Sequence, residues 1–211
     1  MYKLIKAKAI HAKQIIPYLT ITCYWKEFVE GNDLNQDYES FMLQWVVNPR
    51  LPYTTVLVKE GDDDIIYGCV IAATLEQLGT MPDYTPHMHP KAYELFKPWL
   101  QCSVADSVVV ELFAVAKELR GKGYGAQLYQ VAEDLAKKEG KDTLTGFVWA
   151  CFPDSLITCT RRGFMVTKLI EFSAPVKMPL LYLEKKPEFA ALKDYFQSEE
   201  YSAEKNMVLK K

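Results

Sequence analysis

One stretch, residues 108–126 (VVVELFAVAKELRGKGYGA), constrains this chain more than any other part of the sequence. It begins as an apolar, β-branched run, which predicts a buried strand. It ends in a glycine-rich turn beside Arg120 and Lys122, and a helical pattern starts immediately afterwards. A strand, a turn and a helix in this order bring backbone N–H groups and the positive end of a helix dipole together. The stretch therefore predicts an anion-binding site.

Three glycines alternate within the turn, at Gly121, Gly123 and Gly125. Glycine permits positive φ and leaves no Cβ in the way of an approaching ligand. A diphosphate is the anion that such a turn favours. The segment also fits the G-x-G-x-x-A pattern of dinucleotide sites, but that pattern should follow its strand at once. Here five residues separate Val115 from Gly121, and the next strand ends in WACF, without the acidic residue expected there. The sequence also lacks a nucleotide-triphosphate P-loop.

The chain as a whole predicts one globular domain over residues 1–211. Apolar residues make up 49% of it, and its formal net charge is -2. Such a balance argues against disorder and against a dedicated nucleic-acid binder. The five cysteines are scattered without a CxxC pair, which indicates reduced thiols rather than a disulfide framework or a zinc site. No signal peptide and no membrane span are evident, so we expect a cytoplasmic protein without membrane partners.

Periodicity along the chain predicts an α/β domain with one central sheet. The expected strands are residues 2–7, 53–59, 65–75, 108–115, 143–150, 165–172 and 179–184. Helices are expected at residues 11–29, 37–47, 123–139 and 153–159, the second of them closed by Asn48-Pro49. Residues 79–106, rich in proline and aromatic residues, form an insertion between the third and fourth strands. They are either an element of a substrate pocket or a surface excursion.

The pattern Arg120-x-x-Gly123-x-Gly125 resembles the acyl-CoA-binding signature of the GNAT superfamily of N-acetyltransferases. The order of expected elements over residues 2–183 also matches that fold. Strand 144–150, the helix after Pro153 and the ending at residues 162–164 match a second motif of the family. The resemblance implies a mixed, mostly antiparallel sheet of about seven strands flanked by helices.

The resemblance also implies acetyl-CoA (coenzyme A) as co-substrate, no metal, and a small-molecule or peptide amine as acceptor. The diphosphate would lie on the N–H groups of residues 121–126, and the pantetheine arm would pair along the strand edge at residues 113–115. A strand N–H there would polarise the thioester carbonyl for direct attack by the amine. The expected coenzyme-binding residues are Phe113, Val115, Arg120, Gly121, Lys122, Gly123, Tyr124, Gly125 and Ala126.

Glu111, in the middle of the apolar strand, is the expected general base. Removal from water favours the protonated carboxyl group unless a cation pairs with it. A paired, structural glutamate is the alternative interpretation. Strict alternation predicts that Glu111 shares its face with Val109, Phe113 and Val115, opposite Val108, Val110, Leu112 and Ala114.

Cys159 occupies the position, four residues before the Gly-Phe pair, where many family members have a tyrosine general acid. A thiol has a reference pKa of about 8.5, so Cys159 is a candidate donor of the proton to the leaving thiolate. The alternatives are a small buried cysteine without a chemical role, and protonation by solvent. The departure from the family pattern keeps a second hypothesis open, a non-catalytic acyl-CoA-binding module. An NAD(P)-binding protein is a third.

Two further segments carry weaker signals. His87 and His89 lack a third ligand, so a loop or a substrate contact is favoured over a metal site. The tail from Pro187 has Phe189, Leu192 and Phe196 at helical spacing, which would cover the domain or a partner such as a second copy in a homodimer.

Overall fold

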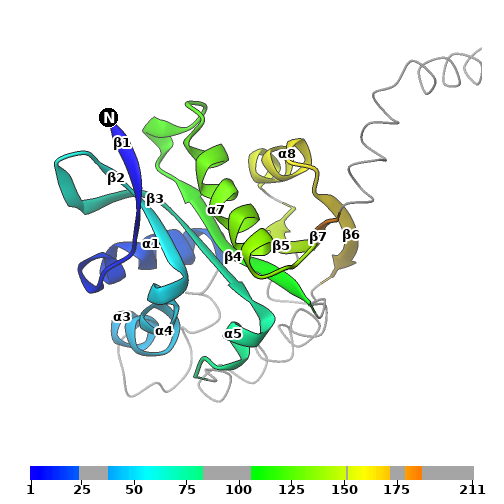
Figure 1. Ribbon diagram of the computed structural model, residues 1–211, viewed down its shortest axis with the longest axis horizontal. Coiled ribbons are helices and arrows are strands. Elements are labelled where there is room, and N and C mark those ends of the chain that lie inside the picture. Colours follow the sequence, from blue (N-terminus) through cyan, green and yellow to red (C-terminus); the bar gives the residue numbers. More distant parts are fainter. Residues whose placement is uncertain (24–37, 83–105, 151, 172–178, 187–211) are drawn as a thin grey trace, which may run out of the picture.

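The computed structural model describes residues 1–23, 38–82, 106–150, 152–171 and 179–186. These residues form one seven-stranded sheet in the order β1-β2-β3-β4-β5-β7-β6, flanked by helices (Figure 1). The strands are β1 (Tyr2–Lys6), β2 (Thr54–Lys59), β3 (Asp62–Thr74), β4 (Ser107–Val115), β5 (Thr143–Trp149), β6 (Met165–Ile170) and β7 (Leu180–Lys185). Of the strand pairs in these residues, only β4 with β5 is parallel. The predicted mixed, mostly antiparallel sheet is confirmed.

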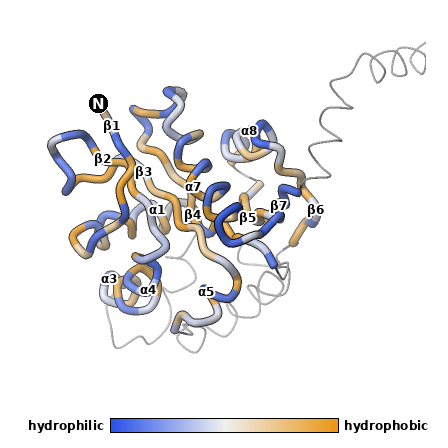
Figure 2. Tube along the Cα trace, in the orientation of Figure 1, coloured by the Kyte–Doolittle hydropathy of each residue, from blue (hydrophilic) through white to orange (hydrophobic). Residues whose placement is uncertain are grey.

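Helices cover both faces of the sheet and bury two apolar clusters. One cluster joins α1 (Ala12–Cys23) and α3 (Tyr38–Phe41) to residues such as Val56 and Ile71. The other joins α7 (Tyr124–Lys138) and α8 (Pro153–Arg161) to residues such as Leu57 and Val70. Strands covered on both sides read as nearly continuous apolar runs, and much of the tube along β3 and β4 is orange in Figure 2. Within the described ranges, no helix has both the length and the apolar content to cross a membrane.

The insertion between the third and fourth strands is confirmed by its two ends. The short helix α5 (Leu75–Gly79) follows β3 directly, and β4 begins at Ser107. Most of the insertion, including His87 and His89, lies outside the described residues, as does the tail from Pro187.

The second helical region continues further than the sequence predicted. After α3 come a π-helical turn (Met42–Val47), α4 (Asn48–Arg50) and a 3-10 turn (Leu51–Tyr53). The predicted stop at Asn48-Pro49 is wrong, because Pro49 falls in the first turn of α4, where the missing N–H costs little. The extension matters because it places Arg50 against β4, with only 6% of that residue exposed.

A β-bulge interrupts β4 at Glu111. Ile71 of β3 pairs with Leu112, whereas the next residue, Ala72, pairs with Val110. Glu111 is therefore the extra residue, with no register partner on β3.

The bulge makes the predicted alternation of β4 wrong. Val108 and Val110 pack in the α7 cluster, but Leu112 packs in the α1 cluster. Phe113 and Val115 then return to the α7 side. One inserted residue shifts the period of two, so the side chains after Glu111 lie on the face opposite to the one predicted.

β4 and β5 pair with each other over only four residue pairs, from Ser107 with Thr143 to Val110 with Gly146. Beyond that point β4 continues to Val115 along β3, while β5 continues to Trp149 along β7. Among the strands of the described chain, none pairs with β4 on this side after Val110. The sheet therefore divides at the bulge.

Candidate active site

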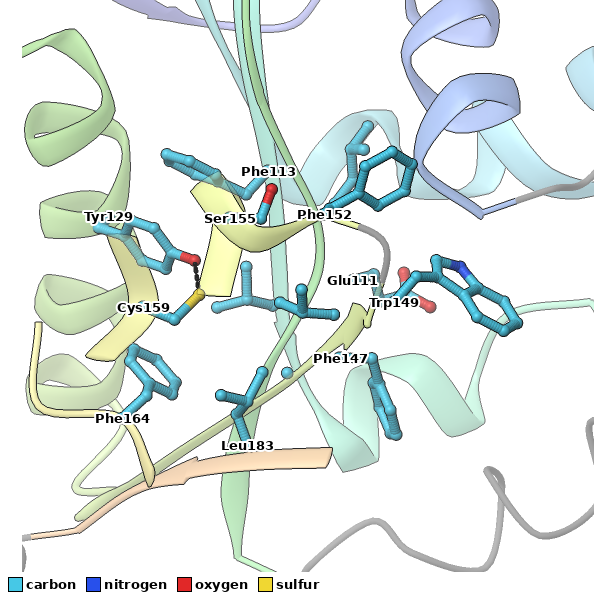
Figure 3. Close-up of a pocket in the computed structure, with 14 residues that line it drawn as sticks. Glu111, Phe113, Tyr129, Phe147, Trp149, Phe152, Ser155, Cys159, Phe164 and Leu183 are labelled. Atoms are coloured by element: carbon cyan, nitrogen blue, oxygen red, sulfur yellow. Dashed lines mark hydrogen bonds between the residues drawn. The ribbon is translucent and has the colours of Figure 1, made fainter. Parts of the chain in front are cut away.

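A cavity of about 70 Å³ lies where β4 and β5 diverge (Figure 3). Its wall combines Glu111 and Phe113 from β4, Trp149 from β5, Tyr129 from α7 and Cys159 from α8. The lining is mostly aromatic and aliphatic, with few polar groups, which is the usual composition of a small-molecule site.

A larger groove of about 610 Å³ lies beside this cavity and is lined in part by residues of the glycine turn. Phe113, Phe152 and Ser155 line both spaces, so the two adjoin each other. The outer end of the groove is lined by Arg120, Gly121, Gly125 and Arg161. The structure thus places a cationic turn and an apolar cavity on two adjoining spaces.

The turn exposes backbone donors at the start of α7. Gly121 and Gly123 have φ of 76° and 85°, which is the left-handed region that favours glycine. Gly123 is the N-cap of α7, and among the described residues no side chain caps this end. The first turn of α7 carries no acidic residue, while Arg120 and Lys122 beside it are exposed. These features favour an anion at this helix end.

Gly125 has a different role from the other two glycines of the turn. A Cβ at Gly125 would lie 3.1 Å from the Phe113 ring, so the absence of a side chain lets α7 approach β4 closely. That approach brings the helix end to the groove.

The expected coenzyme-binding residues fall into two groups. Five of them line the groove: Phe113, Val115, Arg120, Gly121 and Gly125. Lys122, Gly123 and Ala126 lie in the turn or the first turn of α7, outside the groove lining. Tyr124 packs edge-on against Tyr2, with ring centroids 5.3 Å apart, on the α7 side of the sheet.

Arg50 holds the carboxylate of Glu111 from the opposite face of the sheet. Its Nε donates a hydrogen bond to Glu111 Oε2 at 2.7 Å, and its Nη2 donates one to Oε1 at 3.1 Å. The Nη1 atom donates to the carbonyl of Val46 at 3.1 Å. Both side chains are nearly buried, with 7% of Arg50 and 11% of Glu111 exposed. No local sequence pattern marks this pair, because the two residues lie 61 positions apart.

Tyr129 is the second residue that the sequence analysis missed. Its hydroxyl lies 2.8 Å from the sulfur of Cys159 (dashed line in Figure 3), and both residues are buried. Burial raises the pKa of Tyr129 well above its usual value, and the nearby Cys159 raises this pKa further. Burial also raises the pKa of Cys159, although its hydrogen bond to Tyr129 acts in the opposite direction. Both groups therefore carry their protons at neutral pH.

A signal for Tyr129 was present in the helix periodicity. Tyr129, Ala132 and Ala136 follow the i, i+3, i+7 spacing of a buried face, and all three are buried. The neighbouring stripe of Tyr124, Leu128, Val131 and Leu135 is less buried than this one, apart from Leu128.

Comparison with known families defines the class of this protein. The profile of the Acetyltransferase (GNAT) family matches residues 20–164, which is more than half of the chain. The chain belongs to the GNAT acetyltransferase family. The predicted family resemblance is thereby confirmed.

Several solved structures have a similar fold. One is a mosquito arylalkylamine N-acetyltransferase-like protein 5b, at 18% identity and a TM-score of 0.57, covering 88% of this chain and 100% of that chain. Another is the NatC complex bound to Gag peptide and CoA, at 17% identity and a TM-score of 0.54, covering 88% and 97%. A third is a GNAT family acetyltransferase from Elizabethkingia anophelis with acetyl-CoA bound, at 12% identity and a TM-score of 0.52, covering 88% and 97%. No curated protein matches the sequence.

Proposed function

We propose that this protein transfers an acetyl group from acetyl-CoA to a primary amine by direct attack of the amine on the thioester. The observation that carries the proposal is that the groove lined by the turn before α7 adjoins the cavity at the β4–β5 divergence. Membership of the GNAT acetyltransferase family supports acetyl transfer. Fold neighbours solved with CoA or acetyl-CoA, and one named as an arylalkylamine N-acetyltransferase, support this donor and an amine acceptor.

In this proposal the backbone of the protein binds most of the donor. The diphosphate lies on the N–H groups of residues 121–126, assisted by the charges of Arg120 and Lys122. The pantetheine arm follows β4 beyond Val110, where no strand in the described residues pairs with it on that side. The acetyl group enters the cavity beside the bulge, where a strand N–H polarises its carbonyl.

Glu111 has two candidate roles, general base and structural ion-pair partner. The two hydrogen bonds from Arg50 favour the structural role, because they occupy both carboxylate oxygens and offset their charge. Replacing Glu111 by Gln separates the roles. A base predicts a lower kcat and an altered pH–rate profile with unchanged affinity for acetyl-CoA. A normal pH–rate profile, together with a lower melting temperature, would assign Glu111 to the ion pair.

Two measurements test the proposed function. Isothermal titration with acetyl-CoA and with NADH distinguishes an acyl-CoA site from a dinucleotide site, and absence of acetyl-CoA binding would end the proposal. Release of free thiol from acetyl-CoA over a panel of arylalkylamines, polyamines, amino acids and peptides then tests for turnover. Binding without thiol release over such a panel would favour the alternative, a non-catalytic acyl-CoA-binding module.

A further inference from the structure

Tyr129 and Cys159 meet inside the cavity from two different helices, α7 and α8. We propose that they act as one proton-donating pair for the leaving thiolate of coenzyme A, with the Tyr129 hydroxyl as the donor. The inference rests on the proposed function, since that function places the thioester in this cavity. It assigns the acid to a residue that the family signature does not mark.

The ring of Tyr129 packs against two other aromatic rings. Phe113 stacks against it with centroids 4.1 Å apart and planes inclined by 29°. Phe164 lies on another side, with its centroid 5.8 Å away. Because Phe113 also lines the groove, the residue that fixes Tyr129 is one along which the pantetheine arm would run. The hydroxyl therefore has a defined position relative to the proposed path of the donor.

The other protic side chains of the cavity are less suitable donors. Glu111 is paired with Arg50, on the opposite side of the sheet from α7. Ser155 is exposed, and an aliphatic hydroxyl is a much weaker acid than a phenol. Tyr124 packs against Tyr2 instead of lining the cavity.

The pair contains two protons and one hydrogen bond, and either atom can donate within it. When the Cys159 thiol donates to the phenolic oxygen, the phenolic proton is free to point into the cavity. As the amine attacks, a C–N bond forms, the C–S bond breaks, and the electron pair of that bond stays on the coenzyme sulfur. This sulfur takes the phenolic proton, and the thiol hydrogen bond stabilises the phenolate that remains.

Proton balance is completed outside the pair. The amine nitrogen loses one proton to solvent or to a base, and the phenolate regains one from solvent after the products leave. The net reaction converts amine and acetyl-CoA into amide and free coenzyme A thiol. It needs no oxidant, metal or further co-reactant.

The charges around the pair are compatible with this cycle. Burial keeps the pKa of both groups high, so the resting pair is protonated. The positive charge of Arg162, at the end of α8, lowers the pKa of Tyr129 and would stabilise the transient phenolate. Glu133 of α7 lies 3.8 Å from Arg162 but is also bound by Lys185 at 2.6 Å.

The test compares the binding of coenzyme A with that of desulfo-coenzyme A, which lacks the sulfur. Isothermal titration at pH 7 and at pH 9.5 gives the ratio of the two dissociation constants. At pH 9.5 the ligand thiol ionises more readily, since the reference pKa of a thiol is about 8.5. A phenolic donor aimed at the thiolate should raise the preference for coenzyme A about tenfold over this range. The Tyr129→Phe variant should lose this pH-dependent increase in the preference for coenzyme A, while it keeps the ring contacts.

The controls distinguish a proton donor from a structural residue. Cys159→Ser should keep most of this pH-dependent increase, because a hydroxyl can still donate to Tyr129. Tyr67→Phe should keep all of it, because Tyr67 lines neither the cavity nor the groove. A structural role for Tyr129 predicts equal losses for both ligands and an unchanged ratio, which would overturn the inference. A ratio in the unmodified protein that does not change with pH would overturn it as well, even if Tyr129→Phe does not fold. Absence of binding of both ligands to the unmodified protein would instead reject the proposed function.

Discussion

The glycine turn after β4 and the bulge within β4 contribute to the same candidate site by different means. The turn offers backbone N–H groups, and its geometry depends on Gly121 and Gly123, which lie within one short stretch. The bulge brings together side chains from distant segments: Arg50 reaches Glu111 from 61 positions away. A site made of backbone is encoded locally, whereas a site made of side chains depends on how the whole chain packs.

This difference leads to distinct expectations for substitutions. Changes in the turn should affect ligand binding more than the free energy of unfolding, to which they add only the strain of a side chain at positive φ. Changes around the bulge should affect unfolding, because the side chains there also hold the sheet to its helices.

The largest effect is expected from replacing Arg50 by Met. This change leaves Glu111 nearly buried without its cation, and removal of one partner from a buried pair typically costs about 3–5 kcal/mol. Urea denaturation measures the loss. Lys13→Met is the matched control, because Lys13 pairs with Glu39 at an exposed site (70% and 54% exposed), where a pair contributes about 1 kcal/mol or less. Equal losses in the two variants would show that the buried pair does not organise the bulge.

Replacing Gly123 by Asp should weaken acetyl-CoA binding about a hundredfold, since a carboxylate a few ångströms from the diphosphate repels it. The measurement is isothermal titration. Gly140→Asp serves as control, because Gly140 also has positive φ and open space around it but lies at the other end of α7. Similar affinities for the two variants would contradict the assignment of the turn.

A smaller loss of stability is expected for Gly68→Ala in β3. A Cβ there would lie 2.8 Å from the carbonyl oxygen of Ala114, so β3 and β4 would have to move apart at a cost of about 1–3 kcal/mol. Gly79→Ala, with nothing within 4 Å, should be nearly neutral. If Gly68→Ala also leaves the free energy of unfolding unchanged, the close approach of β3 to β4 beyond the bulge does not constrain the site.

The smallest effect concerns the pH dependence of stability. The pKa of Tyr129 is higher in the folded protein than its ordinary value of 10.0, so its contribution is fully present below pH 10. Above pH 10 the unfolded chain loses the proton first, and stability falls by up to about 1.4 kcal/mol per pH unit. Urea denaturation at pH 8 and pH 11 should show a smaller alkaline loss in Tyr129→Phe. Parallel losses in both proteins would mean that Tyr129 titrates normally when folded.

The fold was predictable from the sequence because most of its strands and helices carry clear local patterns. All seven strands, the insertion after the third, and the helix after the glycine turn follow from alternation, helical spacing and turn residues. The faces of β4 were not predictable, because the extra residue at Glu111 is specified by pairing with β3 and not by the composition of β4.

The elements around the candidate site were predictable to the same extent. The glycine turn and the strand before it could be located from residues 108–126 alone. Arg50 could not, because Asn48-Pro49 suggested a helix end where the structure continues the helix through Arg50. Tyr129 was visible as part of a buried helical face, but its contact with Cys159 depends on the packing of α7 against α8.

The four residue pairs between β4 and β5 determine how firmly the two parts of the sheet are joined. They are the only backbone ladder, among the described strands, between the group β1–β4 and the group β5, β7 and β6. A pantetheine arm bound along the free edge of β4 would continue this short ladder and brace the two groups against each other. Hydrogen exchange at the amides of residues 143–149 should then slow when acetyl-CoA binds. In that case the donor substrate would serve, while bound, as a temporary part of the sheet.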